Sequence, residues 1–434
     1  MSDNEIVEVR AREVIDSRGN PTVEAEVWTS GSVGRAIAPS GASTGVHEAL
    51  ELRDGNDRFL GKGVQQAVEN VRGPISRALV GRDATDQASV DRAMIDLDGT
   101  DDRSSLGGNA MTAVSLACAH AGAGVKGVEL HEHLRPGSRV LPVPMMNIIN
   151  GGEHAGGELR IQEFMVMPAG APSFREALRM GVEVYHHLRS ILKERFGKSS
   201  INLGDEGGFA PPFDTAPQAL DVMEEAIRAA GLDPGREVYL CMDAAASEFF
   251  SGGSYHLDGR DLSTEELMDY FADLRDRYPL VSLEDPVEEE DLQGMARMTS
   301  SLGEGLQLVG DDLFVTNPRR VSKAVEMGAG NALLLKVNQI GTVTEAMEAA
   351  KLARDSGYNT VVSHRSGETE DTSIADIAVA LECGQIKTGA PARGERTSKY
   401  NRLLRIEEEL GKKAVFPGIR AVKDRPYSPR AQQE

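Results

Sequence analysis

The chain has 434 residues, 40% of them hydrophobic and 26% charged, a composition typical of a globular protein large enough for two domains. Its 68 acidic and 47 basic residues give a net charge of -21, which argues against nucleic acid or an anionic membrane surface as the main partner. The three cysteines are odd in number, separated and set in apolar runs, as expected of reduced core thiols in a cytosolic protein.

The N-terminal segment gives no sign of secretion. Its first ten residues, MSDNEIVEVR, are acidic and lack the apolar stretch of a signal peptide. Residues 106–125 contain no Asp, Glu, Lys or Arg, but they are rich in glycine and alanine and include Asn109 and His120. We therefore expect a buried helix there and no membrane span.

The first part of the chain predicts an α+β domain. Alternating apolar residues and a turn at 16–21 predict a three-stranded antiparallel meander over residues 5–15, 22–30 and 34–39. Helical patterns follow at residues 64–80, 86–97 and 109–121. The sequence RPG at 135–137 and two nearby prolines mark the predicted boundary, so this domain spans residues 1–137.

The second domain, residues 138–434 with a tail from about residue 414, predicts a (β/α)8-type barrel. Short apolar runs alternate with long helical patterns, and eight strand candidates over about 250 residues match the size of this fold. The predicted strands cover residues 164–167, 201–203, 238–242, 280–283, 306–309, 333–335, 360–362 and 385–386. Helix starts are marked by Ser263-x-x-Glu266, Asn317-Pro318 and Thr342-x-x-Glu345.

Two further patterns are assigned no site. The sequence HEH at residues 131–133 lacks the spacing of a zinc site, and we expect it on a polar helix face. The glycine pattern at residues 122–127 follows a helix instead of a strand, which argues against a dinucleotide site.

Reactive side chains follow seven of the predicted strands. In chain order these residues are Glu206, Asp243, Glu284, Asp311, Lys336, His364 and Lys387. From Asp243 onward, successive members lie 23 to 41 residues apart, the length of one strand and one helix. We therefore expect all of these side chains to meet at one end of a single barrel.

Three of these residues predict a metal site. Asp243, Glu284 and Asp311 offer only oxygen, with no histidine or cysteine at equivalent positions, which favours Mg²⁺ over zinc. Any one carboxylate could instead cap a helix, but three at successive strand ends favour the metal.

The remaining strand-end residues predict acid-base chemistry. A metal beside Lys336 and Lys387, together with burial, lowers a lysine pKa and makes a neutral amine that can accept a proton from carbon. Glu206 would be the opposite partner, a protonated acid whose proton is favoured by the charge of Asp205. Arg365 and Ser366 suit a phosphate clamp, and the small-residue loop at 40–45 suits a closing lid.

Several long motifs of the chain closely resemble the enolase family. They are SGASTGVHEALELRD, GDEGGFAPP, SLEDP, GDDLFVTNP, LLLKVNQIGT, SHRSGETEDT, IKTGAP and KYNRLLRIEEEL. The resemblance runs from about residue 5 to residue 410, while the tail beyond about 414 matches nothing we recognise. It implies a glycolytic lyase that dehydrates 2-phospho-D-glycerate reversibly to phosphoenolpyruvate, a reaction that also serves gluconeogenesis.

The resemblance also implies a role for individual residues. Lys336 would remove the C2 proton, and Glu206 would assist loss of the C3 hydroxyl. One Mg²⁺ would be held by Asp243, Glu284 and Asp311, and a second Mg²⁺ would have Ser43 as its protein ligand. Arg365 and Ser366 would hold the phosphate of the substrate, and Lys387 would hold its carboxylate. The pocket would be lined by His154, Gln162, Glu163 and His364. Glu284 and Asp311 would reach the substrate through the metal.

The family further implies a cytoplasmic homodimer or octamer, with room for a secondary surface or secreted pool. Two alternatives stay open at this point. One is a related barrel enzyme that abstracts a proton α to a different carboxylate, against which the phosphate-side residues Ser43, Arg365 and Ser366 argue. The other is a scaffold or surface-binding protein that keeps the fold without the reaction.

Overall fold

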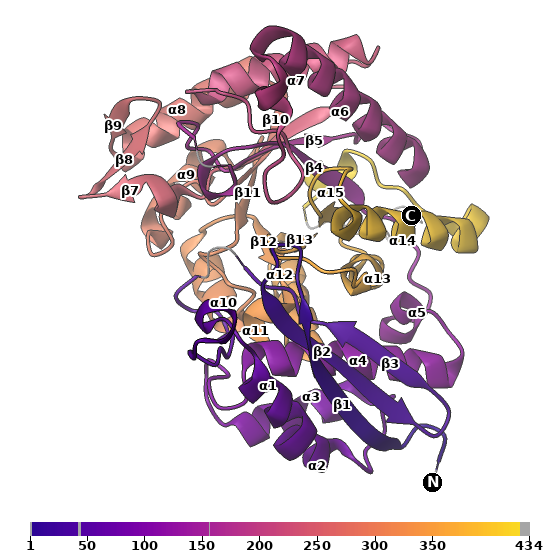
Figure 1. Cartoon of the computed structure of the whole chain (residues 1–434). Coiled ribbons are helices and arrows are strands. Elements are labelled where there is room, and N and C mark those ends of the chain that lie inside the picture. The colour runs from indigo at the N-terminus through magenta and orange to yellow at the C-terminus, as the bar shows by residue number, and fades with distance from the viewer. Residues whose placement is uncertain (1, 42–44, 156, 426–434) are drawn as a thin grey trace.

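The computed structural model describes residues 2–41, 45–155 and 157–425. A small sheet with its helices lies below a larger barrel (Figure 1). The two parts meet along α11 (Val337–Ile340), α12 (Val343–Asp355) and α13 (Ser373–Leu381). Within the described residues, no helix combines the length and apolar character needed to cross a membrane.

The N-terminal domain contains the predicted antiparallel meander. Its strands are β1 (Ile6–Ile15), β2 (Pro21–Thr29) and β3 (Val33–Ile37), paired in the order β1-β2-β3. Its helices are α1 (Gln65–Asn70), α2 (Ser76–Leu79), α3 (Gln87–Asp98), α4 (Gly108–Lys126) and α5 (Leu130–Leu134). The charge-free stretch forms α4, which packs against β2 and β3 and is buried over most of its length, as the sequence predicts.

One predicted helix is interrupted. A wider helical turn at Val71–Ile75 joins α1 to α2 and contains Pro74. Proline has no N–H to donate to the preceding turn, so the wider turn lets the helix continue past it.

Eight strands close into a barrel in the order β10-β11-β12-β13-β14-β4-β5-β6. Their bounds are β4 (Val143–Asn150), β5 (Glu163–Met167), β6 (Tyr239–Asp243), β10 (Leu280–Glu284), β11 (Gln307–Gly310), β12 (Ala332–Leu335), β13 (Asn359–Ser363) and β14 (Gln385–Lys387). β5 runs antiparallel to both of its neighbours, and the other six pairs are parallel. The amino end of β5 therefore lies beside the carboxyl ends of the other barrel strands.

One strand prediction is wrong. Residues 201–203 do not enter the barrel, since Lys198–Ile201 forms a 3-10 turn and Leu203 is exposed. The eighth strand is β4, where Pro142 and Pro144 had been interpreted only as a domain boundary. Pro144 pairs with Ile386 of β14, and the strand continues past it to Asn150.

The barrel is surrounded by helices α6 (Phe174–Phe196), α7 (Ala216–Ala229), α8 (Thr264–Arg277), α9 (Leu292–Leu302), α10 (Pro318–Met327), α11 (Val337–Ile340), α12 (Val343–Asp355), α13 (Ser373–Leu381) and α14 (Gly394–Leu410). A short three-stranded sheet, β7 (Phe250–Ser251), β8 (Ser254–Leu257) and β9 (Arg260–Leu262), lies before α8. The predicted starts of α8, α10 and α12 are confirmed, with Ser263, Asn317 and Thr342 as the N-cap residues.

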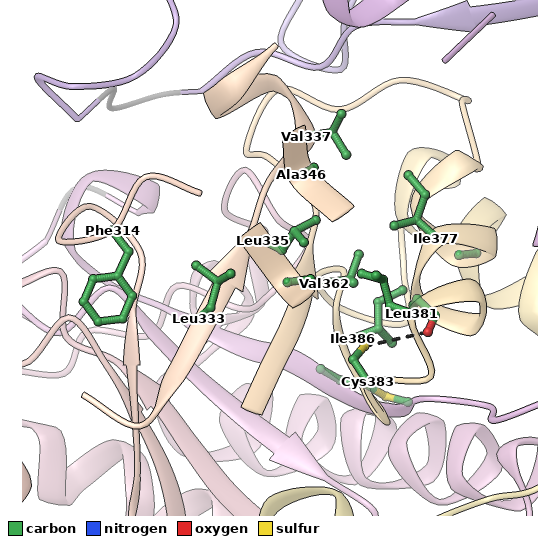
Figure 2. Packing of buried hydrophobic residues seen from close by; sticks show 14 of the residues in the cluster. Phe314, Leu333, Leu335, Val337, Ala346, Val362, Ile377, Leu381, Cys383 and Ile386 are labelled. Carbon is green, nitrogen blue, oxygen red and sulfur yellow. Dashed lines mark hydrogen bonds between the residues drawn. The ribbon is translucent and has the colours of Figure 1, made fainter. Parts of the chain in front are cut away.

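Alternation along the strands separates two parts of the core. In β12, Leu333 and Leu335 pack against the surrounding helices (Figure 2), whereas Ala332 and Leu334 belong to a separate cluster inside the barrel. All four side chains are fully buried, as expected of a strand covered on both faces.

The segment after α14 closes one end of the barrel. Val415 exchanges backbone hydrogen bonds with Arg139 and Leu141 at 2.9 and 2.8 Å. Helix α15 (Arg420–Lys423) then places Ala421 and Val422 in the interior cluster. Because these residues contact the amino ends of the strands, the opposite end is left for the chemistry.

The histidines of residues 131–133 are buried, contrary to the prediction of a polar helix face. His131 is 4% exposed and His133 is 8% exposed, because α5 packs between α4 and α13.

Candidate active site

The carboxyl ends of the barrel strands bring the predicted residues together. Asp243, Glu284 and Lys387 are the last residues of β6, β10 and β14. Three further residues, Asp311, Lys336 and His364, come directly after β11, β12 and β13. Six of the seven residues predicted from the spacing thus lie at one end of the barrel because each strand ends there.

Glu163 and Glu206 reach this end by other routes. Glu163 is the first residue of the antiparallel strand β5, and it pairs with Asp243 at the end of β6. Glu206 lies in a turn closed by the hydrogen bond from the Gly204 N–H to the Gly208 carbonyl, 2.8 Å. The Asn147 amide on β4 donates to Glu206 Oε2 at 3.1 Å, which holds this carboxyl beside the barrel even though no strand precedes it.

Together these side chains enclose a cavity of about 40 Å³. Most predicted site residues line it: His154, Gln162, Glu163, Glu206, Asp243, Asp311, Lys336, His364, Arg365, Ser366 and Lys387. Glu284 is not among the lining residues but contacts Lys387 at 2.8 Å, while Ser43 lies outside the described residues. Because the cavity holds little more than water, we expect a bound substrate to displace some of these side chains.

Lys387 fills the space between three carboxylates. Its Nζ lies 2.9 Å from Asp243 Oδ2, 2.8 Å from Glu284 Oε1 and 3.2 Å from Glu163 Oε1. Burial lowers the pKa of Lys387, but the three carboxylates raise it well above its ordinary value. Burial also raises the pKa of Glu284, and the charge of Asp243 adds to this effect. The Lys387 ammonium therefore balances the negative charge of these three carboxylates, which a bound divalent cation could balance as well.

Lys336 forms an ion pair with Asp311 Oδ2. Burial lowers the pKa of Lys336, but the Asp311 carboxylate outweighs burial and the net shift is upward. The predicted lowering depends on a cation bound beside the lysine and stays a prediction, since here the charge of the Asp311 carboxylate acts on the ammonium. The other oxygen, Asp311 Oδ1, accepts a hydrogen bond from Gln339 Nε2 at 2.8 Å.

Asp285 fixes the backbone that carries Asp311. Its Oδ1 accepts from the Asp311 N–H and its Oδ2 from the Asp312 N–H, both at 2.8 Å. Asp285 has a φ of 38°, a region that Asp adopts more readily than most residues, and its side chain is buried. The Asp285 carboxylate thus orients the loop that follows β11.

The donor set fits a hard divalent cation. Glu284 Oε2 is buried without a hydrogen-bond partner among the described residues. The oxygens of Asp285, Asp311 and Asp312 approach one another within 4.8 Å, as do the ligand atoms of His154, Glu163 and Glu206. Of the predicted ligands only Asp311 belongs to either group, because Asp243 and Glu284 are drawn to Lys387. All the carboxylates offer oxygen, the ligand that Mg²⁺ prefers.

Glu163 and Glu206 form the acidic side of the cavity. His154 Nδ1 lies 3.8 Å from Glu163 Oε1 and 4.0 Å from Glu206 Oε1, and His364 Nε2 lies 3.2 Å from Glu206 Oε2. Burial and the charge of Glu206 raise the pKa of Glu163 well above its ordinary value. Burial also raises the pKa of Glu206, but positive charge on His364 and His154 lowers it further than burial raises it.

The two imidazoles do not keep that charge at neutral pH. Burial lowers the pKa of His154, and it lowers the pKa of His364 to about 4. Two buried carboxyls this close cannot both ionise cheaply beside neutral imidazoles. We therefore expect Glu163 and Glu206 to share one proton at pH 7, whereas the sequence had placed that proton on Glu206 alone.

The N-terminal domain contributes to the opposite side. Glu48 accepts from both terminal nitrogens of Arg365, at 2.8 and 3.2 Å, and Asn338 Oδ1 accepts from the same guanidinium at 3.1 Å. Burial lowers the pKa of Arg365 and Glu48 raises it, with a net upward shift. The predicted phosphate clamp is thus held in place from the neighbouring domain.

Sequence reasoning missed Asn147, Glu48, Gln339, Asp285 and Arg396. The fully buried Arg396 on α14 donates to the Arg365 and Ser366 carbonyls, both at 2.6 Å. Glu48 and Asp285 lie inside motifs that resemble the enolase family. Their position as acidic residues within these motifs could have indicated a role in the site. Asn147 and Arg396 carry no comparable signal, because each acts through a contact with a distant segment.

Comparisons with known proteins agree with this arrangement. Residues 6–134 match the family description "Enolase, N-terminal domain", and residues 138–425 match "Enolase, C-terminal TIM barrel domain", which extends past residue 414 into the tail. The chain is 59% identical to the enolase of Methanopyrus kandleri over 415 residues, 95% of this chain and 97% of that protein. It is 59% identical to the enolase of Methanocaldococcus jannaschii over 94% of this chain and 96% of that protein, and 56% identical to that of Thermococcus kodakarensis over 95% and 97%. The chain belongs to the enolase family.

Proposed function

We propose that the chain is a phosphopyruvate hydratase that converts 2-phospho-D-glycerate reversibly to phosphoenolpyruvate and water with Mg²⁺. One observation supports this most directly. Lys336 follows β12, and Glu163 begins β5, and these two strands are four places apart in the closed order of eight. A basic residue and an acidic pair thus lie on opposite sides of one cavity, as an elimination requires.

Lys336 is the proposed base. It takes the proton from C2 of the substrate as a neutral amine, so its pKa must fall from the raised value that the ion pair with Asp311 gives it. Engaging Asp311 with a metal would remove much of that carboxylate's effect on the ammonium. Gln339 holds the other Asp311 oxygen and so keeps the carboxylate from following the lysine.

The Glu163–Glu206 pair is the proposed source of the second proton. Glu206, held by Asn147, donates it to the departing C3 hydroxyl, and His154 and His364 pack against the pair as neutral imidazoles. Glu163 keeps a proton available because its own pKa is raised by burial and by Glu206. Gln162 lines the same wall of the cavity.

Asp243, Glu284 and Asp311 are the residues that would hold the first Mg²⁺, and Ser43 is proposed for a second. When bound, Mg²⁺ would stabilise the extra negative charge that builds up on the substrate carboxylate as C2 loses its proton. Lys387, released from Asp243 and Glu284, would hold the same carboxylate group. Arg365 and Ser366 would hold the phosphate at the side that faces the N-terminal domain.

Three broader points stay proposals. The chain would act in the cytoplasm in glycolysis and gluconeogenesis, it would assemble as a homodimer or octamer, and its domains would divide at residues 137 and 138.

The reaction is tested by following phosphoenolpyruvate formation through its ultraviolet absorbance. We expect activity with Mg²⁺, loss of activity with EDTA, and recovery when Mg²⁺ is restored. Lys336→Ala should lower kcat by about 10²–10⁴-fold, the usual contribution of a positioned base. Lys323→Ala, at an exposed position on α10, is the matched control and should retain the wild-type rate.

Two results would reject the assignment. One is a wild-type protein without activity on 2-phosphoglycerate at any Mg²⁺ concentration. The other is a folded Lys336→Ala protein with turnover close to that of wild type.

A further inference from the structure

A second cavity lies between the two domains, away from the candidate active site. Its volume is about 470 Å³, within the range of small-molecule sites. It is lined by residues of α3, α4, α5, α12 and α13 and of the adjoining loops: Thr85, Gln87, Ala88, Lys126, His133, Leu134, Arg135, Thr344, Met347, Glu348, Lys351, Arg354, Ala380 and Leu381.

The floor of this interdomain cavity is one face of α12. Residues 344, 347, 348, 351 and 354 recur at intervals of three and four, the spacing that places side chains on the same side of a helix. Met347 lines the cavity together with Leu134 from the N-terminal domain and Leu381 from α13, so the apolar part of the lining comes from both domains. Leu381 is a buried core residue at the end of α13 (Figure 2).

The charged part of the lining is mainly cationic. It contains Lys126, Arg135, Lys351 and Arg354, opposed by Glu348. Arg135 pairs with Glu382 at 3.1 Å and Lys351 pairs with Asp355.

Two of these cations form no ion pair within the described residues. Across the part of the chain that the structure describes, no carboxylate lies within 4 Å of Lys126 or of the Arg354 guanidinium. Arg354 donates one hydrogen bond to the Leu381 carbonyl, which leaves the rest of its donor fork for another acceptor.

His133 lies on the same wall of the cavity. Its side chain is 8% exposed, and Nδ1 is buried without a hydrogen-bond partner within the described ranges. Because this nitrogen is buried, His133 lines the cavity without offering it to a ligand.

We propose that the interdomain cavity binds a small amphipathic anion, whose apolar body lies on Met347, Leu134 and Leu381 and whose carboxylate, sulfonate or phosphate meets Lys126 and Arg354. Such a ligand would bridge α12 to the N-terminal domain. It would therefore stabilise the contact between the domains in proportion to its occupancy.

The test uses 8-anilinonaphthalene-1-sulfonate, which carries one sulfonate on an aromatic body, titrated into the full-length protein. We expect one saturable site per chain. The double variant Lys126→Gln/Arg354→Gln should weaken binding on the order of tenfold or more, because it removes charge-assisted hydrogen bonds. The uncharged probe N-phenyl-1-naphthylamine should bind wild type and this variant alike.

Two further variants separate the site from the fold. Ala88→Trp, at an exposed position on the rim, should fill the cavity and abolish binding of both probes without lowering the thermal midpoint. Arg92→Gln/Lys323→Gln removes two exposed charges outside the cavity and should leave binding unchanged. The inference is overturned if no saturable site exists, if Ala88→Trp binds as wild type does, or if the sulfonate probe binds the double glutamine variant with unchanged affinity. Dehydration of 2-phosphoglycerate is measured separately on the same proteins and should not change, so failure here leaves the proposed reaction untouched.

Discussion

At the scale of single residues, Asp285 controls the position of a proposed metal ligand without being one. Its two oxygens accept the Asp311 and Asp312 N–H groups, both at 2.8 Å. Asp285→Asn keeps the shape but turns an –NH2 group toward one of these donors. We expect a 10–100-fold loss of Mg²⁺ affinity, the usual effect of removing a group that orients a ligand.

The measurement is calorimetric titration of Mg²⁺ together with the Mg²⁺ dependence of the rate. Asp269→Asn, at an exposed position on α8, is the matched control and should bind Mg²⁺ as wild type does. Unchanged Mg²⁺ affinity in a folded Asp285→Asn protein would show that the loop after β11 holds Asp311 by itself.

The residues of the site differ in how far the sequence reveals them. Asp243 to Lys387 could be predicted because each follows an apolar strand and recurs with the length of one strand and helix. Glu48 could not be paired with Arg365, because 317 residues separate them and the contact exists only after the two domains dock. Protonation was equally hidden, since it depends on the distances between Glu163, Glu206 and their neighbours.

At the scale of elements, the first turn of α12 is capped from three sources. Thr342 accepts from the Glu345 N–H at 3.2 Å, a bond that its sequence predicts. The Val343 N–H donates to Ser115 Oγ and the Thr344 N–H to Asp91 Oδ2, both at 2.9 Å, so α4 and α3 supply the other two acceptors. Helix α12, the second helix after Lys336, is thus fixed to the N-terminal domain.

Removing the Asp91 cap should loosen that attachment. Asp91 is fully buried and also accepts from the Gln87 amide at 3.0 Å, so Asp91→Ala leaves several donors unsatisfied. We expect a loss of about 2–4 kcal/mol in the free energy of unfolding, measured by denaturant titration. Asp96→Ala, on the exposed face of α3, which also carries Asp91, should change the free energy of unfolding by less than about 0.5 kcal/mol. Equal stabilities of the two variants would mean that the interdomain cap contributes nothing.

Strand β4 shows why one element escaped prediction. Its residues, VPMMNIIN, contain a proline that suggests a break, and both faces are buried, so no alternation marks the strand. The stretch at 201–203 has the short apolar pattern of a strand, but its backbone turns at Lys198–Ile201 and only isolated pairing to Phe209 remains. Pairing with β14 and β5 decides that β4, and not the segment at 201–203, enters the barrel. The local sequence pattern contains no information about this pairing.

At the scale of the whole molecule, buried histidines make stability depend on pH. Burial lowers the pKa of His131, His154 and His364, and it lowers that of His133 to about 4 with a further contribution from Lys126. The unfolded chain binds a proton on each histidine near pH 6.5, more tightly than the folded protein does. The contribution of His133 and His364 is therefore fully present above about pH 6.5 and is lost as pH falls toward 4, and that of His131 and His154 is lost in the same direction.

His133 lets one such contribution be isolated, because it lies away from the proposed metal ligands, in the lining of the interdomain cavity. In wild type, the free energy of unfolding should fall between pH 6.5 and pH 4. The variant His133→Gln keeps a polar side chain of similar size but does not titrate, so that fall should be smaller by about 1–3 kcal/mol. This is less than the whole pKa shift of His133 would give, because solvent enters the cavity. Denaturant titrations at successive pH values with EDTA present measure both slopes. His187→Gln, exposed on α6, controls for loss of a histidine and should keep the wild-type slope. If the His133→Gln slope also equals that of wild type, then the His133 imidazole is protonated in the folded protein as readily as in the unfolded chain, and the domain contact around it opens to water.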